Sequence, residues 1–123
     1  MRSAKPRIQG RSRRTKALTF ADVRRIAGAL PGAEEGTSYG TPAFKVRGKL
    51  FARLREDGES LVVRVDFAQR GTLMAADPKA FYITDHYRDY PMMLVGLSAV
   101  RPGELRELLA QSWRSVAPKK LLE

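Results

Sequence analysis

The sequence contains no cysteine and a single histidine, His86, in 123 residues. Without thiols there is no disulfide framework, no thiolate metal site and no cysteine nucleophile. Zinc and non-haem iron sites usually use two or three imidazoles, so one histidine argues against a metal centre of that kind. We therefore expect neither a metal ion nor a cofactor.

Long apolar runs are also missing from the sequence. No stretch approaches the roughly 20 apolar residues that cross a bilayer, and no apolar segment follows the N-terminal positive charges as it does in a secretory signal. We expect a cytoplasmic protein without membrane contact. A length of 123 residues fits one domain with a modest core, and we expect a monomer.

Acidic residues are few beside the basic ones, with 13 Asp and Glu against 23 Lys and Arg and a formal net charge of +10. Residues 1–18 contain no acid and little that is apolar, which predicts a disordered basic tail followed by a folded domain over 19–123. The basic residues of this tail are Arg2, Lys5, Arg7, Arg11, Arg13, Arg14 and Lys16. Such a tail either contacts phosphates non-specifically or serves as a solubilising extension.

Hydrophobic periodicity predicts an amphipathic helix near each end of the domain, one after the N-cap residue Thr19 and one starting near Pro102. A short helix is expected over 68–76, and Asp57-Gly58 predicts a hairpin turn. The predicted strands lie at residues 43–54, 61–67, 81–84 and 92–100. This order predicts an α+β fold, in which an antiparallel sheet carries both terminal helices on one face.

Strand alternation places most basic side chains of the hairpin on the exposed face of this sheet. The predicted phosphate contacts are Lys45, Arg47, Lys49, Arg53, Arg55 and Arg64, joined by Arg88 from the loop before the last strand. The predicted stacking residues are Phe51, Tyr87 and Tyr90. Positive charge neutralises phosphates and aromatic rings stack on bases, so this pattern favours DNA binding with little sequence specificity. The alternative is a solvated face of ordinary surface charge.

The segment EEGTSYG, residues 34–40, is rich in glycine but does not fit a phosphate-binding loop, because it follows a helix and precedes a strand. We interpret it as an irregular edge that leads into the sheet. His86 lies near aspartates, yet the spacing brings no nucleophile to it, so we do not expect an enzyme. Trp113 falls on the apolar stripe of the last helix, which favours a place in the core.

A second functional hypothesis remains open. The aromatic loop 85–91 and the glycine-rich segment 34–40 would together form a protein-interaction or small-molecule-binding surface, with a ligand near Tyr39 or His86. An aromatic cleft with poor access for phosphates would favour this hypothesis over DNA binding.

Three motifs carry a resemblance to a known family: Leu30-Pro31-Gly32, residues 40–46 (GTPAFKV) and Ala117-Pro118-Lys119. With them, the sequence resembles the MmcQ/YjbR family across nearly all of 19–122. The resemblance implies a fold like that of bacterial frataxin and a DNA-binding role proposed as a double-wing arrangement. Frataxins bind iron through an acidic first helix, but the first helix here carries Arg24 and Arg25, so iron binding is not expected.

Overall fold

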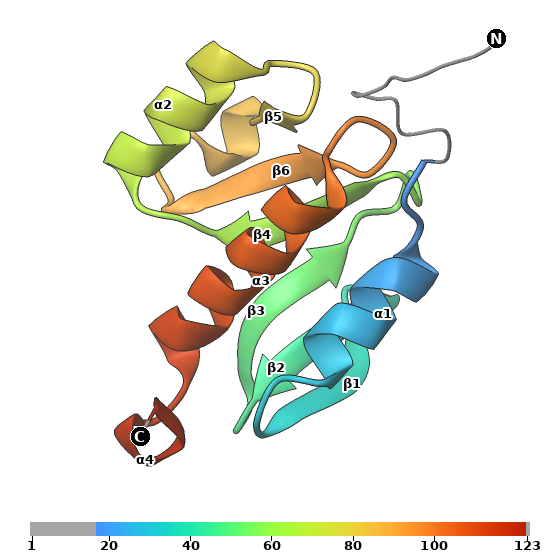
Figure 1. Cartoon of the computed structure of the whole chain (residues 1–123), viewed down its shortest axis with the longest axis vertical. Helices are drawn as coiled ribbons and strands as arrows, with labels where there is room; N and C mark the ends of the chain where they lie inside the picture. Colours follow the sequence, from blue (N-terminus) through green and yellow to red (C-terminus); the bar gives the residue numbers. More distant parts are fainter. Residues whose placement is uncertain (1–16, 123) are drawn as a thin grey trace, which may run out of the picture.

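The computed structural model describes residues 17–122, which form a six-stranded antiparallel sheet in the order β1-β2-β3-β4-β6-β5, with helices (Figure 1). The strands are β1 (Ala33–Ser38), β2 (Thr41–Val46), β3 (Lys49–Leu54), β4 (Ser60–Arg64), β5 (Phe81–Tyr82) and β6 (Met92–Gly96). The helices are α1 (Phe20–Gly28), α2 (Phe67–Ala76), the 3-10 helix η1 (Asp85–Tyr87), α3 (Pro102–Val116) and α4 (Lys119–Leu122). The predicted α+β class and antiparallel sheet are confirmed.

Helices α1 and α3 cover the same face of the sheet, as predicted (Figure 1). Their apolar stripes meet the inward side chains of the strands and form the main core, which includes Trp113. The indole N–H of Trp113 donates to the Pro31 carbonyl at 2.7 Å, so α3 is joined directly to the segment that leaves α1. Helix α1 begins where Thr19 N–H donates to Asp22 Oδ2 at 2.9 Å, the reciprocal half of a capping box.

The glycine-rich segment is a strand, which corrects its interpretation as an irregular edge. β1 pairs with β2 along its whole length, from Ala33 opposite Val46 to Ser38 opposite Thr41. Tyr39 and Gly40 connect the two strands with φ angles of 54° and 81°, and positive φ at both central residues is the signature of a type I′ hairpin turn. The turn closes the hairpin with Tyr-Gly in place of the Asn-Gly pair that is typical of type I′ turns.

A bulge in β3 changes which face its side chains occupy. The β2–β3 register shifts between Phe44 and Lys45, so that Phe44 faces Ala52 while Lys45 faces Leu50. Phe51 is the extra residue, and its side chain is 1% exposed within the core formed by the helices. The prediction that Phe51 stacks on a ligand from the exposed face is therefore wrong, because one inserted residue moved its ring to the other side.

Several boundaries differ from the predicted ones. β4 ends at Arg64 because Asp66 already caps α2, accepting the Gln69 N–H at 2.7 Å. β6 ends at Gly96, whose carbonyl accepts the N–H groups of Ala99 and Val100 in a tight turn. At the N-terminal side, Leu18 packs against the core and its N–H donates to Leu97, so the folded part includes Leu18. Residues 1–16 of the predicted basic tail lie outside the described residues.

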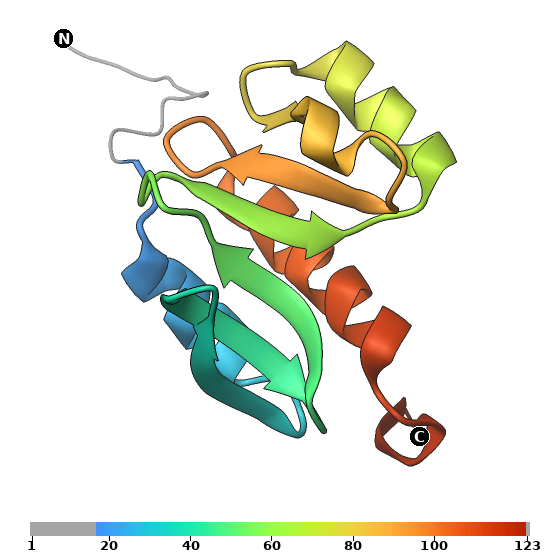
Figure 2. The same cartoon turned by 180° about the vertical axis from the view of Figure 1, so that it is seen from behind.

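The other face of the sheet is covered only in part. Tyr87 of η1 packs on Val62 and Leu94, which form a small second cluster on this side. Figure 2 shows η1 and α2 beside β5 and β6, whereas β1, β2 and β3 face the viewer with no helix in front of them. We refer to this side of the sheet as the open face.

Candidate nucleic-acid interface

Arg47 and Lys49 lie at the turn between β2 and β3, and both side chains are exposed. The turn consists of Arg47 and Gly48, with φ angles of 50° and 82°, and is a second type I′ turn of the same kind as Tyr39-Gly40. Of the seven predicted phosphate contacts, these two are held at the tip of a hairpin and reach into solvent. A phosphate can approach them without displacing any other side chain.

Lys45 and Arg64 are half-buried. Lys45 stands on the open face between Glu34 of β1 and Leu50 of β3, its cross-strand neighbours. Arg64 lies at the end of β4, where its Nε–H donates to the Leu50 carbonyl at 2.9 Å. This bond fixes the guanidinium beside β3 and leaves its two terminal nitrogens available for an anion.

Arg53 stands on the open face as alternation predicted, but its side chain is only 7% exposed. Its guanidinium donates to Thr41 Oγ1 at 3.1 Å and to the Tyr87 hydroxyl at 3.3 Å, and it meets Glu56 Oε2 at 3.4 Å. Arg53 is therefore a structural link between β2, β3 and η1. This corrects its prediction as a phosphate contact, because its donors already have partners.

Arg55 and Arg88 are paired with carboxylates close to them in the chain. Arg55 Nη1 lies 3.9 Å from Asp57 Oδ2, at the opposite end of β3 from Arg47. Arg88 Nη2 donates to Asp85 Oδ1 at 2.8 Å on the exposed aromatic loop. Arg55 therefore does not join Arg47 and Lys49, and Arg88 has a carboxylate partner of its own.

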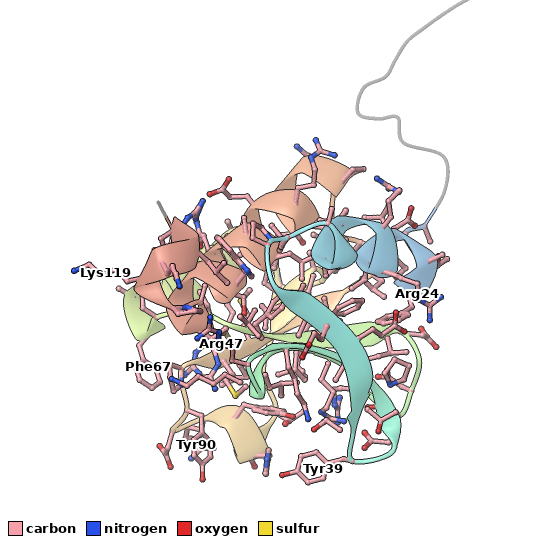
Figure 3. The ribbon with its side chains drawn as sticks, turned by 90° about the horizontal axis from the view of Figure 1, so that it is seen from below. Arg24, Tyr39, Arg47, Phe67, Tyr90 and Lys119 are labelled. Carbon is pink, nitrogen blue, oxygen red and sulfur yellow. The ribbon has the colours of Figure 1, made fainter. Side chains whose placement is uncertain are left out.

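The two tyrosines predicted to stack occupy different environments. Tyr87 is buried against Val62 and Leu94, so the prediction that it offers a free stacking ring is wrong. Tyr90 is 55% exposed and remains available. Tyr39 is 85% exposed at the β1–β2 turn, and Figure 3 shows Tyr39 and Tyr90 on the same side of the molecule, away from α1 and α3.

Three further cations join Arg47 and Lys49 at one end of the molecule, and the sequence reasoning missed them. They are Arg114 in the last turn of α3 and Lys119 and Lys120 of α4, all exposed. Figure 1 places α4 and the β2–β3 turn at the same end, and Figure 3, viewed from that end, shows Lys119 projecting outward. In the sequence, the motif Ala117-Pro118-Lys119 indicates only the family.

Side-chain contacts explain how these elements meet. Gly32 lies between α4 and β2, because a Cβ added there would come within 2.8 Å of Leu121 Cδ1 and 3.5 Å of Val46 Cγ1. Arg64 and Arg114 line one pocket of about 520 Å³ between the end of β4, the start of α2 and the last turns of α3. One carboxylate, that of Asp66, also lines this pocket, and it already caps α2.

We define the basic end as the six cations Arg47, Lys49, Arg64, Arg114, Lys119 and Lys120. Within residues 17–122, no carboxylate lies within ion-pair distance of any of them. Carboxylates gather at the other end of β3, in the turn with Glu56, Asp57 and Glu59, and two more, Glu34 and Glu35, lie near the start of β1 next to Lys45 and Val46. The charge of the domain is therefore uneven, with a concentrated positive field at one end.

Arg70 of α2 is a buried cation that sequence reasoning also missed. It is 9% exposed, and its guanidinium donates four hydrogen bonds to backbone carbonyls of the aromatic loop. The acceptors are Tyr87 at 3.0 Å, Arg88 at 3.0 Å, Tyr90 at 2.8 Å and Met92 at 3.1 Å. The loop that presents Tyr90 is thus fixed from beneath by one side chain. No local signal marks such a residue, since its acceptors lie 17 to 22 positions away.

Comparisons with known proteins agree with this architecture. The YjbR family model matches residues 28–115. Uncharacterised proteins of Mycobacterium bovis and Mycobacterium tuberculosis are 31% identical over 123 aligned residues, covering 85% of this chain and 93% of theirs. The protein belongs to the YjbR family.

One solved structure shares the fold. The crystal structure of a Deinococcus radiodurans protein with a DUF419 domain matches with a TM-score of 0.72 and 26% identity, over 86% of this chain and 83% of that one. The predicted likeness to bacterial frataxin stays a prediction. No helix within residues 17–122 is long and apolar enough to cross a membrane, and no three acidic or histidine side chains in that range gather as metal ligands would.

Proposed function

We propose that this protein binds DNA through the phosphate backbone, using the basic end, with little sequence specificity. The observation that carries the proposal is the gathering of six cations from a strand turn, a strand end and two helices, free of carboxylate partners among residues 17–122. Cations of this kind displace the counterions condensed on DNA, and the released counterions supply the binding free energy.

The arrangement also suits a groove-spanning contact. The β2–β3 turn projects Arg47 and Lys49 from the sheet, while α4 projects Lys119 and Lys120 from the end of the helical layer. Arg64 and Arg114 lie between these two projections, around the pocket they share. A curved polyanion would meet charge at two separated points and at the surface between them.

A salt titration tests the proposal. If all six cations contact phosphates, the slope of log affinity against log salt for a 20-base-pair duplex should be about −5 for the basic end, since each contact contributes about −0.9. The variant Lys119→Gln with Lys120→Gln should reduce the magnitude of the slope by about 2. Fluorescence anisotropy of a labelled duplex of arbitrary sequence measures both.

A matched variant controls for total charge. Lys79→Gln with Arg106→Gln removes the same number of charges from exposed positions outside the basic end. Both variants keep residues 1–16, so any contribution of that segment is the same in each. Equal losses from the two variants would show that net charge alone drives binding, and no binding by the unmodified protein at 50 mM salt would refute the proposal.

A further inference from the structure

Tyr39 has a backbone conformation that bulky residues rarely adopt. Its φ of 54° lies in the left-handed region, where Asn and Gly fit a type I′ turn without strain. Burial does not offset this strain, because the side chain is among the most exposed in the structure. A strained residue that buries so little of its side chain points to a function for the side chain itself.

The ring of Tyr39 is backed by a fixed cation. The Arg53 guanidinium carbon lies 5.3 Å from the ring centroid, a cation–π contact, and Arg53 is itself held by Thr41 and Tyr87. The ring therefore has one side toward the buried guanidinium and the rest of its surface open to solvent. It is positioned to receive a second flat group.

A second exposed ring lies across the open face. Tyr90 sits 6.1 Å from His86, ring centroid to ring centroid, and His86 meets the buried Tyr87 edge-on at 4.7 Å. The four carbonyl bonds from Arg70 hold this loop in place, so the Tyr90 ring is presented by a rigid backbone. Rigid aromatic groups lose little conformational entropy when a ligand stacks on them.

Small residues and the hydrogen-bonded side chain of Arg53 line the sheet between the two rings. Gly36, Ala43, Arg53 and Val62 follow one another across β1 to β4 as cross-strand neighbours. A Cβ added at Gly36 would meet nothing within 4 Å, so the space above this end of the row is empty. Figure 3 shows Tyr39 and Tyr90 projecting on this side of the sheet.

We infer that Tyr39 and Tyr90 stack on unpaired bases of a single-stranded segment laid across the open face. The inference rests on the proposed function and names the form of nucleic acid that this face takes. Every base has a π-face, so stacking on two rings tolerates any sequence. A duplex keeps its bases paired and stacked on one another, so only an unpaired segment offers both rings a partner.

Two matched substitutions separate this inference from phosphate binding. Tyr39→Asn and Arg47→Asn change the equivalent position of the two type I′ turns, and each puts an Asn where positive φ is tolerated. Both variants should melt at or above the temperature of the unmodified protein. Tyr39→Asn removes a ring from the open face, while Arg47→Asn removes a charge from the basic end.

The probes are a labelled 12-nucleotide oligothymidine and a labelled 20-base-pair duplex, titrated with the full chain by fluorescence anisotropy. Tyr39→Asn and Tyr90→Ala should each weaken oligothymidine binding about tenfold, the order of one base–aromatic stack, and leave duplex binding within about twofold. Arg47→Asn should weaken both probes and reduce the salt slope by about 1.

The outcomes are distinguishable. Oligothymidine affinity unchanged in Tyr39→Asn and Tyr90→Ala, with duplex binding present and salt-sensitive, overturns the stacking inference alone. If the protein binds neither the oligothymidine nor the duplex, the proposed function and this inference are both overturned. An equal loss for both probes in Tyr39→Asn also refutes selective stacking on unpaired bases.

Discussion

Arg70 offers the sharpest test of how the aromatic loop is held. Replacing it with Met keeps an unbranched side chain of similar length but removes the charge and all donors to four carbonyls. Two of these acceptors belong to the exposed residues Arg88 and Tyr90, and the Tyr90 carbonyl also accepts the Met92 N–H at 2.7 Å. The Tyr87 carbonyl keeps the Tyr90 N–H as a donor at 3.2 Å, whereas the carbonyl of the half-buried Met92 would be left poorly satisfied.

A buried carbonyl without a donor costs about 1–3 kcal/mol, so the Met92 carbonyl predicts a loss of about that size in the free energy of unfolding. Such a loss is a large fraction of the total stability of a domain of this size. Lys at position 70 should recover little of it, because one ammonium cannot reproduce the planar fork that spans these acceptors.

Urea unfolding followed by the fluorescence of Trp113, the one tryptophan in the chain, measures this loss. Arg106→Met, an exposed arginine of α3, is the control and should change stability by less than about 0.5 kcal/mol. Hydrogen exchange should show that the 85–92 backbone loses protection before the core strands do. An Arg70→Met protein within 1 kcal/mol of the unmodified one would refute the reasoning.

Two other side chains should prove equally informative. Ser112 is buried, accepts the Arg64 N–H at 2.9 Å and donates to the Phe51 carbonyl at 2.5 Å. Ser112→Ala should therefore lower the free energy of unfolding in urea by about 2 kcal/mol. An unchanged free energy of unfolding would contradict this role. Burial works to raise the pKa of Asp57, but hydrogen bonds from Glu59 and Ser60 outweigh it and leave that pKa below its ordinary value. Asp57→Ala should therefore lower the free energy of unfolding by about 1 kcal/mol at neutral pH. The difference in this free energy between the variant and the unmodified protein should shrink as pH falls through the folded-state pKa of Asp57, because protonation removes the same stabilisation from the unmodified protein. A difference independent of pH would argue against the ionised carboxylate as the cause.

Helices α1, α2 and α3 and the order of the core strands along the chain follow from the sequence because their signals are local. Apolar residues at helical spacing, such as Leu105, Leu108 and Leu109, mark the buried face of α3 whatever it packs against. The β3–β4 turn is also predicted from local sequence, since the Asp57 carboxylate accepts a nearby backbone N–H and Gly58 tolerates a positive φ. Strand β1 was missed because its sequence, AEEGTS, lacks the β-branched alternation of a typical strand and depends on pairing with β2.

The candidate site was harder to predict because it depends on contacts between distant residues. Leu50 and Phe51 are both apolar, so the hydrophobic pattern does not predict the bulge that places the Phe51 side chain in the core. The sequence predicts an exposed arginine at position 53, because the residue that helps to bury it, Tyr87, lies 34 positions away in the chain. The basic end requires α4 to pack near the β2–β3 turn, and that packing passes through Leu121 and Gly32.

The strand order also determines how the protein meets its own copies. At one border of the sheet β5 has only two residues, too short to recruit another strand. At the other border β1 offers six residues with free backbone groups on its outer side, a template for sheet-to-sheet aggregation. Glu34 and Glu35 lie on this border, but Arg24 neutralises Glu35 with an ion pair at 2.9 Å, so approach of an identical border would bring two Glu34 carboxylates together. The charge of Glu34 therefore disfavours pairing of this border with an identical one.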